Sequence, residues 1–176
     1  DQEFPKRCAH ADGVRVVETK NMTRKIEVAC NHRASEEFLI VARTDSLSII
    51  GIDDAISRGN EYAKAGADIL FIEGAKTAEQ LKCIADSIEA PLMVKMVPEF
   101  QNLSLDTKAL GKLGYDVAIY PSLAFLAAGA ALQAGFKELY EKGCVGETKM
   151  MNFGAFSELI GFEEIYEFDA QWGNKT

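Results

Sequence analysis

The stretch Phe38-Leu39-Ile40-Val41-Ala42-Arg43-Thr44-Asp45 shows the pattern from which the fold of this chain can be predicted. Five apolar residues are followed by three polar ones, which indicates a strand buried on both faces with polar groups at its carboxyl end. The same pattern, a short apolar run closed by a polar residue or a proline, recurs at 69–72, 91–94 and 117–120. These runs are predicted to be strands of one sheet.

Helix signals separate the predicted strands. Thr77 and Gln80 have the spacing of a capping box, and Ser104 can serve as the N-cap of a helix that ends at Leu113. Because strands that alternate with helices form parallel sheets with right-handed crossovers, the chain is predicted to be an α/β protein. Its helices are expected over the ranges 22–30, 53–65, 78–88 and 104–113.

Two architectures share this alternation, the doubly wound sheet and the (β/α)8 TIM barrel. No Gly-x-Gly-x-x-Gly sequence or P-loop follows any predicted strand, which argues against a nucleotide-binding doubly wound fold. A complete barrel usually needs about 250 residues, and this chain has 176. We therefore expect an N-terminally truncated barrel with about four βα units, followed by C-terminal helices.

The composition is that of a globular protein, with 48% hydrophobic and 26% charged residues. A net charge of −8 argues against nucleic acids and anionic membranes as partners, so an anionic substrate must meet a local group of cations. Four widely spaced cysteines fit neither a zinc site nor a disulfide framework. We expect reduced thiols and a cytoplasmic protein, or one of the mitochondrial matrix or peroxisome if the source is eukaryotic. Because the sequence begins without Met, we also expect a processed or truncated product.

The C-terminal part differs in character. Residues 122–142 are rich in Ala and Leu, which predicts one long helix, and residues 150–172 place aromatic side chains at helical spacing among acidic ones. Such a stripe is typical of a docking surface, here against another subunit. We predict a partial barrel over 1–143 and a C-terminal helical segment over 144–176.

Reacting groups of parallel α/β folds gather at the carboxyl ends of the strands. Cations and carboxylates at these ends predict a site for a small dicarboxylate held by Arg43 and by a divalent metal. Alternatively, Arg43 and Asp45 pair only with each other, and Glu73 forms a structural ion pair. A buried ammonium at Lys95 would need a partner. The polar residues at the strand ends are Arg43, Thr44, Asp45, Glu73, Lys95, Glu99, Tyr120 and Ser122.

Cys8 is a candidate reactive cysteine. Lys6 and Arg7 precede it and His10 follows it, and nearby positive charge stabilises a thiolate. The alternative is that Cys8 is a small buried side chain whose charged neighbours have no chemical role.

Several motifs occur together in one order. They are Pro5-Lys6-Arg7-Cys8-Ala9-His10, Val41-Ala42-Arg43-Thr44-Asp45, the segment from Ala65-Gly66-Ala67-Asp68 to Phe71-Ile72-Glu73, Tyr120-Pro121 and Phe156-Ser157-Glu158-Leu159-Ile160. With these motifs the chain resembles the isocitrate lyase and phosphoenolpyruvate mutase superfamily, in the branch of methylisocitrate and 2,3-dimethylmalate lyases. The resemblance covers nearly the whole sequence and corresponds to the C-terminal half to two-thirds of a family member.

The resemblance implies a (β/α)8 barrel whose last helix is exchanged between subunits, and hence a homo-oligomer. It also implies Mg2+ (or Mn2+) and chemistry on small 2-oxo or 2-hydroxy dicarboxylates. By this resemblance Cys8 is the general acid that protonates the enolate left by carbon–carbon cleavage, and Arg43 binds the substrate carboxylate. Glu73 lies near metal and substrate, and His10 helps to place the carboxylate.

Three positions depart from the family pattern. Ala9 replaces a glycine at a backbone that approaches substrate, Lys95 stands where the family has asparagine, and Leu126 stands where methylcitrate-cycle lyases have arginine. The last difference favours a substrate smaller than a tricarboxylate. The family's metal-binding acids lie upstream of Asp1, so no certain metal ligand is expected within this chain.

The resulting prediction is a magnesium-dependent carbon–carbon lyase for a substituted malate or a methylisocitrate-type substrate. We expect the parent protein to be active and this chain alone to be inactive. Two alternatives remain: oxaloacetate decarboxylation or hydrolysis on the same scaffold, and a non-catalytic fragment or paralogue retained for assembly.

Overall fold

The fold is described from a computed structural model, which covers residues 1–8, 11–97 and 105–173. The chain forms two compact units, Asp1–Leu123 and Ala124–Thr176. The first unit contains the predicted sheet. Among the described residues, no helix is long and apolar enough to cross a membrane.

The sheet of the first unit is parallel and four-stranded. Its strands are β1 (Val41–Thr44), β2 (Ile69–Ile72), β3 (Leu92–Lys95) and β4 (Val117–Ile119), and their spatial order is their order in the sequence. A doubly wound sheet reverses its strand order at one point, whereas a barrel adds each strand beside the preceding one. The observed order is therefore that of a barrel segment.

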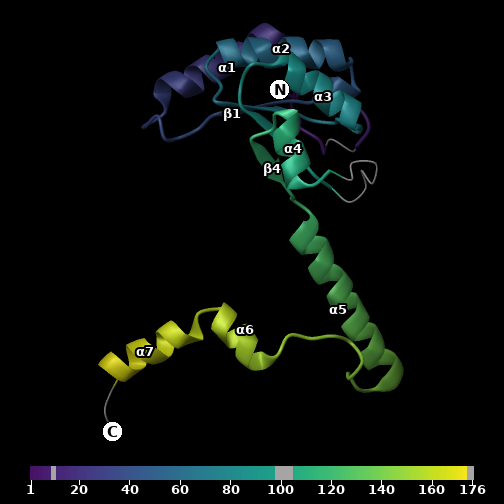
Figure 1. The fold of residues 1–176 in the computed structure, drawn as a ribbon, viewed down its shortest axis with the longest axis vertical. Coiled ribbons are helices and arrows are strands. Elements are labelled where there is room, and N and C mark those ends of the chain that lie inside the picture. The colour runs from purple at the N-terminus through teal and green to yellow at the C-terminus, as the bar shows by residue number, and fades with distance from the viewer. Residues whose placement is uncertain (9–10, 98–104, 174–176) are drawn as a thin grey trace. The chain divides into compact units, whose positions relative to one another are not determined.

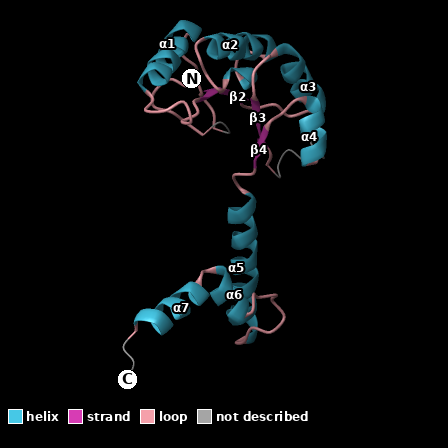
Figure 2. Ribbon diagram, turned by 60° about the vertical axis from the view of Figure 1, so that its left-hand side comes forward, coloured by secondary structure: helices cyan, strands magenta, loops and turns pink. Residues whose placement is uncertain are grey.

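Helices cover one side of this sheet (Figures 1 and 2). They are α1 (Thr19–His32), α2 (Ile52–Lys64), α3 (Ala78–Ser87) and α4 (Thr107–Leu113), with a 3-10 turn η1 (Ser46–Ser48) after β1. The hydrophobic core lies between the helices and the sheet, because alternate strand residues point toward the helices. Fully buried side chains on this side include Tyr62, Leu70, Leu81, Ile84, Leu92 and Leu110.

The helix caps agree in part with those predicted from the sequence. The Thr77 hydroxyl accepts a hydrogen bond from the backbone N–H of Gln80, as predicted, while the Gln80 side chain accepts from the backbone N–H of Lys76. For α4 the side chain of Asp106 accepts from the N–H of Ala109 and forms the N-cap. The predicted cap, Ser104, lies outside the described residues.

The first strand was predicted to begin three residues before its actual start. It begins at Val41 rather than at position 38, and the side chains of Phe38 and Leu39 are 66% and 54% exposed. The expectation of burial on both faces was wrong for this stretch, because the described helices cover only one side of the sheet. The strand instead continues through Arg43 to Thr44, with alternating burial.

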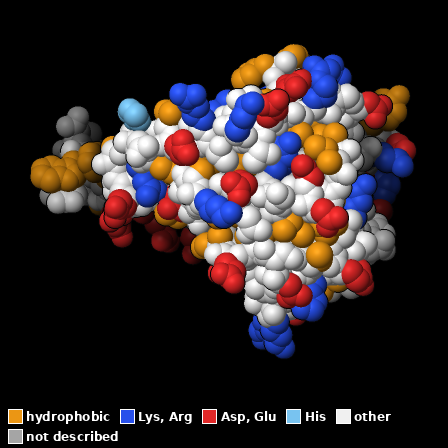
Figure 3. Space-filling view, turned by 90° about the horizontal axis from the view of Figure 1, so that it is seen from above, with side chains coloured by type: hydrophobic (Ala, Val, Ile, Leu, Met, Phe, Trp, Pro, Cys, Tyr) orange, Lys and Arg blue, Asp and Glu red, His pale blue; other side chains and the backbone are white. Residues whose placement is uncertain are grey.

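The outward face of the helices carries both signs of charge. Figure 3 shows Lys and Arg side chains interspersed with Asp and Glu over this surface. Pairs one helical turn apart contribute to this mixture, such as Lys64 with Glu61 at 2.8 Å and Lys82 with Asp86 at 2.7 Å. Exposed pairs of this kind contribute little to stability, and this face is a solvated surface.

The second unit is helical. It comprises most of α5 (Leu123–Lys142), with α6 (Phe153–Leu159) and α7 (Phe162–Trp172). The long helix was predicted, and many large apolar side chains of these helices are exposed, as expected for the aromatic stripe. The unit boundary falls at the start of α5, whereas the sequence analysis placed it after residue 143; the predicted role of 144–176 in subunit exchange stays a prediction.

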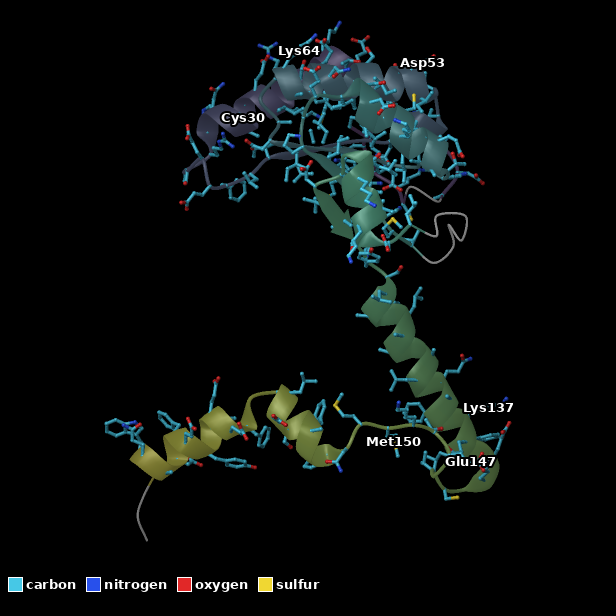
Figure 4. The ribbon with its side chains drawn as sticks, viewed as in Figure 1. Cys30, Asp53, Lys64, Lys137, Glu147 and Met150 are labelled. Atoms are coloured by element: carbon cyan, nitrogen blue, oxygen red, sulfur yellow. The ribbon has the colours of Figure 1, made fainter. Side chains whose placement is uncertain are left out.

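A carboxylate fixes the connection after α5. The Glu138 carboxylate accepts hydrogen bonds from the backbone N–H groups of Gly146, Glu147 and Thr148 at 3.0, 2.8 and 2.8 Å. The Thr148 hydroxyl donates to the same carboxylate at 2.6 Å. The connection, in which Figure 4 labels Glu147 and Met150, is therefore held at the end of the helix.

Candidate functional site

The sheet face opposite the helices carries the candidate site. Successive side chains of a strand point to opposite faces of the sheet. In β1 and β3 the buried side chains on the helix side are Ala42, Thr44, Leu92 and Val94. Arg43 and Lys95 therefore lie on the other face. A pocket of about 490 Å³ opens there. The residues that line it include Lys6, Arg7, Cys8, Arg43, Asp45 and Lys95.

Arg43 is held as a rigid fork. Its Nε and Nη2 donate to the two carboxylate oxygens of Asp45 at 3.0 and 2.7 Å, and its guanidinium carbon lies 5.1 Å from the centre of the Phe71 ring. Nη2 also lies 3.5 Å from Oε2 of Glu73. Burial opposes the guanidinium charge, but the hydrogen bond with Asp45 and the charges of Asp45 and Glu73 raise the pKa of Arg43. The cation is thus fixed and permanently charged.

Glu73 lies between two cations. It follows β2, its backbone N–H donates to the carbonyl of Thr44 at 2.9 Å, and its side chain is 4% exposed. The Lys95 ammonium donates to Oε1 of Glu73, which supplies the partner that the sequence required for this lysine. Oε2 of Glu73 is buried and makes no hydrogen bond within the described part of the chain, and Arg43 is its neighbouring cation. Three adjacent strand ends therefore present the row Arg43, Glu73, Lys95.

Cys8 lies at the exposed part of the pocket lining. Arg43 lines the same pocket. The neighbouring cation Arg7 is anchored, since Nη1 donates to the carbonyl of Asp12 at 2.9 Å and its backbone N–H donates to Gln2 at 2.8 Å. Both bonds hold Arg7 to other residues of the N-terminal stretch.

The structure brings together four of the predicted site residues, Cys8, Arg43, Glu73 and Lys95. Ala9, His10 and Glu99 lie outside the described residues. Tyr120 and Ser122 do not contribute to the lining of this pocket. Sequence reasoning missed Asp1 and Gln2, which also line it, because neither belongs to a strand end or to a charge pattern.

The described residues do not fit a metal site by themselves. No group of three or more His, Cys, Asp or Glu side chains that could hold an ion occurs in 1–8, 11–97 and 105–173. The three buried carboxylates of the site already lie beside cations, Asp1 with Arg58, Asp45 with Arg43 and Glu73 with Lys95. Their charge is neutralised within the protein.

Comparisons with known proteins show what this chain resembles. The chain is 36% identical to 2,3-dimethylmalate lyase of Eubacterium barkeri over 172 residues, which covers 96% of this chain and 59% of the lyase. It is 34% identical over 173 residues to a probable 2-methylisocitrate lyase of Corynebacterium glutamicum, covering 97% of this chain and 56% of that protein. The chain therefore spans less than two thirds of the length of these relatives.

Solved structures match the fold. Oxaloacetate acetylhydrolase, bound to the inhibitor 3,3-difluorooxalacetate, superposes with a TM-score of 0.88 and 26% identity over all of this chain and 60% of that one. Phosphonopyruvate hydrolase, bound to oxalate and Mg2+, gives a TM-score of 0.82 and 25% identity over 99% of this chain and 61% of that one. The prediction of four parallel βα units forming part of a TIM barrel is confirmed.

A family model described as phosphoenolpyruvate phosphomutase matches residues 6–140, a range that contains Cys8, Arg43, Glu73 and Lys95. The sequence resemblance, the strand order and the relatives all agree with this match. The chain belongs to the phosphoenolpyruvate phosphomutase family, within the phosphoenolpyruvate mutase and isocitrate lyase superfamily.

Proposed function

We propose that the protein containing this sequence is a carbon–carbon lyase that acts on a small 2-hydroxy dicarboxylate of the substituted-malate type. The observation that carries the proposal is the pocket that Cys8 lines together with two cations from the sheet, Arg43 and Lys95. Arg43 offers a planar fork that matches a carboxylate, and its position is fixed by Asp45. The lyase relatives support the same reaction class.

In this proposal the chain's own residues bind the substrate and transfer one proton. Arg43 binds a carboxylate of the substrate and stabilises negative charge as it develops, and Lys95 adds a second positive charge on the same face. When the carbon–carbon bond breaks, the substrate hydroxyl releases its proton to solvent and becomes the carbonyl of one product, and the other fragment leaves as an enolate. The Cys8 thiol donates its proton to that enolate carbon as general acid and becomes a thiolate, which the nearby Arg43 stabilises.

The test is Cys8→Ser in the complete protein. A hydroxyl is a far weaker acid than a thiol, so turnover of 2,3-dimethylmalate should fall by at least about a hundredfold. The affinity for oxalate, which resembles an enolate but takes up no proton, should stay within about twofold of wild type. Wild-type turnover in the variant would exclude Cys8 as the general acid, and equal losses of turnover and oxalate affinity would indicate a binding role instead.

We also propose Mg2+ (or Mn2+) as the cofactor of the complete protein. The phosphonopyruvate hydrolase structure that contains Mg2+ supports this proposal. When bound, such an ion polarises the oxygens of a 2-oxo product as a Lewis acid. The site carboxylates Asp1, Asp45 and Glu73 are paired with cations, so no step above is assigned to the ion.

A second candidate is hydrolysis or decarboxylation of oxaloacetate on the same scaffold. The match to oxaloacetate acetylhydrolase over the whole of this chain favours it. The two reactions use the same carboxylate-binding cations and differ in the bond that breaks. Product analysis with 2,3-dimethylmalate and with oxaloacetate as separate substrates distinguishes them.

For the C-terminal segment 144–176 we propose a role in homo-oligomer assembly by exchange between copies. The exposed aromatic side chains of α6 and α7, such as Phe153 at 82% and Trp172 at 68% exposure, support this role because contiguous apolar surface favours a partner. A chain retained for assembly alone would show the same surface. The turnover measured in the Cys8 test above therefore also distinguishes an enzyme from a non-catalytic relative.

A further inference from the structure

A buried carboxylate, that of the lining residue Asp1, connects the pocket to helix α2. The side chain of Asp1 is fully buried, and its two oxygens have different partners. Oδ1 accepts a hydrogen bond from the backbone N–H of Asp45 at 3.0 Å. Oδ2 accepts from the Tyr62 hydroxyl at 2.7 Å and lies 3.4 Å from Nη1 of Arg58.

The two α2 residues are themselves fixed. Tyr62 is completely buried, and burial raises the pKa of its hydroxyl, which therefore keeps the proton that it donates to Asp1. Arg58 is 6% exposed, and it donates from Nε to Asp54 at 2.7 Å and from Nη1 to the carbonyl of Val17 at 2.7 Å. The helix thus presents a rigid pair of donors to the Asp1 carboxylate.

This chain of contacts ends at the cation of the site. Asp1 fixes the backbone of Asp45, and the Asp45 carboxylate holds the guanidinium of Arg43 with two hydrogen bonds. A carboxylate that accepts a backbone hydrogen bond at one oxygen and a side-chain hydrogen bond at the other cannot rotate without losing one of them. The direction of the Arg43 fork therefore depends, through Asp1 and Asp45, on two α2 residues that do not line the pocket, Tyr62 and Arg58.

We propose that Tyr62 and Arg58 are positioning residues of this site, which act through Asp1 on Asp45 and so set the orientation in which Arg43 receives a carboxylate. The role of Arg43 as the carboxylate-binding cation belongs to the proposed function, whereas the dependence of its orientation on Tyr62 does not. Neither residue lies at a strand end, and neither belongs to the motifs that carry the family resemblance.

The test compares Tyr62→Phe with Tyr115→Phe. Both variants remove one hydroxyl from a buried tyrosine, and Tyr115 donates to the backbone carbonyl of Leu81 at 3.1 Å, among residues that do not line the pocket. The first readout is the NMR signal of the Arg43 Nε–H, identified by its loss in Arg43→Lys. The second is the affinity for oxalate in the presence of Mg2+, measured by titration calorimetry on the same protein.

In Tyr62→Phe we expect the Arg43 Nε–H to exchange with solvent about tenfold faster and the oxalate affinity to fall about fivefold, because a charge-assisted hydrogen bond to a buried carboxylate is lost. In Tyr115→Phe both readouts should match wild type. An unchanged Arg43 signal in Tyr62→Phe, or equal changes in the two variants, would overturn the positioning role. Absence of oxalate binding by wild type would count against the proposed function alone, since the Arg43 signal still decides the inference.

Discussion

Removal of the Lys95 ammonium tests how the buried ion pair contributes to the fold. The side chains of Lys95 and Glu73 are 12% and 4% exposed, so Lys95→Met leaves a buried carboxylate whose remaining cation, Arg43, lies 3.5 Å away. Removing one partner of a buried pair costs about 3–5 kcal/mol. Because Arg43 retains part of the attraction, we expect the lower value, about 3 kcal/mol.

The double variant Lys95→Met/Glu73→Gln separates the loss of the pair from the loss of packing. Replacing both members of a buried pair by neutral side chains of similar volume is often close to neutral. The double variant should therefore be more stable than Lys95→Met alone, by about 2 kcal/mol. Its stability should lie within about 1 kcal/mol of wild type.

Hydrogen exchange of the strand amides is the suitable assay, because it reports opening of the sheet separately from the helical second unit. The backbone N–H of Glu73, which donates to the Thr44 carbonyl at 2.9 Å, lies at the centre of the affected region. Lys64→Met is the matched control, since its partner Glu61 is 48% exposed and such a pair contributes less than about 1 kcal/mol. If Lys95→Met lowers the opening free energy no more than Lys64→Met does, the buried pair does not stabilise the sheet and the reasoning is refuted.

Two further predictions concern other parts of the chain. The hydrogen bonds from Thr148 and from the backbone after α5 lower the pKa of Glu138 from 4.5 to about 2, so their contribution to stability is complete above pH 4.5 and is lost as the pH falls toward 2. Amide exchange in the connection should therefore differ between wild type and Glu138→Gln at pH 6 and converge toward pH 2; a constant difference would contradict this. In Gly59→Ala the new Cβ would meet Cδ1 of Ile88 at 2.7 Å. Although Ala has the better helix propensity, we expect the free energy of unfolding, measured in urea, to fall by about 1–2 kcal/mol. A gain in stability would refute the packing argument.

The order of the elements could be predicted because each depends on local pattern. Short apolar runs between capped helices identify parallel strands whatever surrounds them, and the carboxyl ends of such strands identify Arg43, Glu73 and Lys95 as neighbours. The start of β1 could not be predicted in this way. Phe38 and Leu39 continue the apolar run, but whether an apolar residue is buried depends on which faces the rest of the protein covers, and the sequence pattern does not contain that information.

The partners of charged residues were predictable only where they lie close in sequence. The pair of Arg43 with Asp45 was foreseen as one alternative, and the need for a partner at Lys95 followed from the cost of burying an ammonium. That this partner is Glu73 depends on strands β2 and β3 lying side by side. The contact of Asp1 with Tyr62 joins residues separated by 61 positions and had no signal in the sequence.

The arrangement also explains how an acidic chain can present a site for anions. The net charge of −8 is distributed over the molecule, whereas the acids beneath the pocket are buried and paired with specific cations. Because Asp45 holds Arg43 and Glu73 holds Lys95 before any ligand arrives, these cations are already ordered, and binding costs little reorganisation. Asp45 lines the pocket as well, but its carboxylate is occupied by two hydrogen bonds from Arg43. Under the proposed function, a small dianion that contacts both Arg43 and Lys95 would gain from two cations that Asp45 and Glu73 already hold in place.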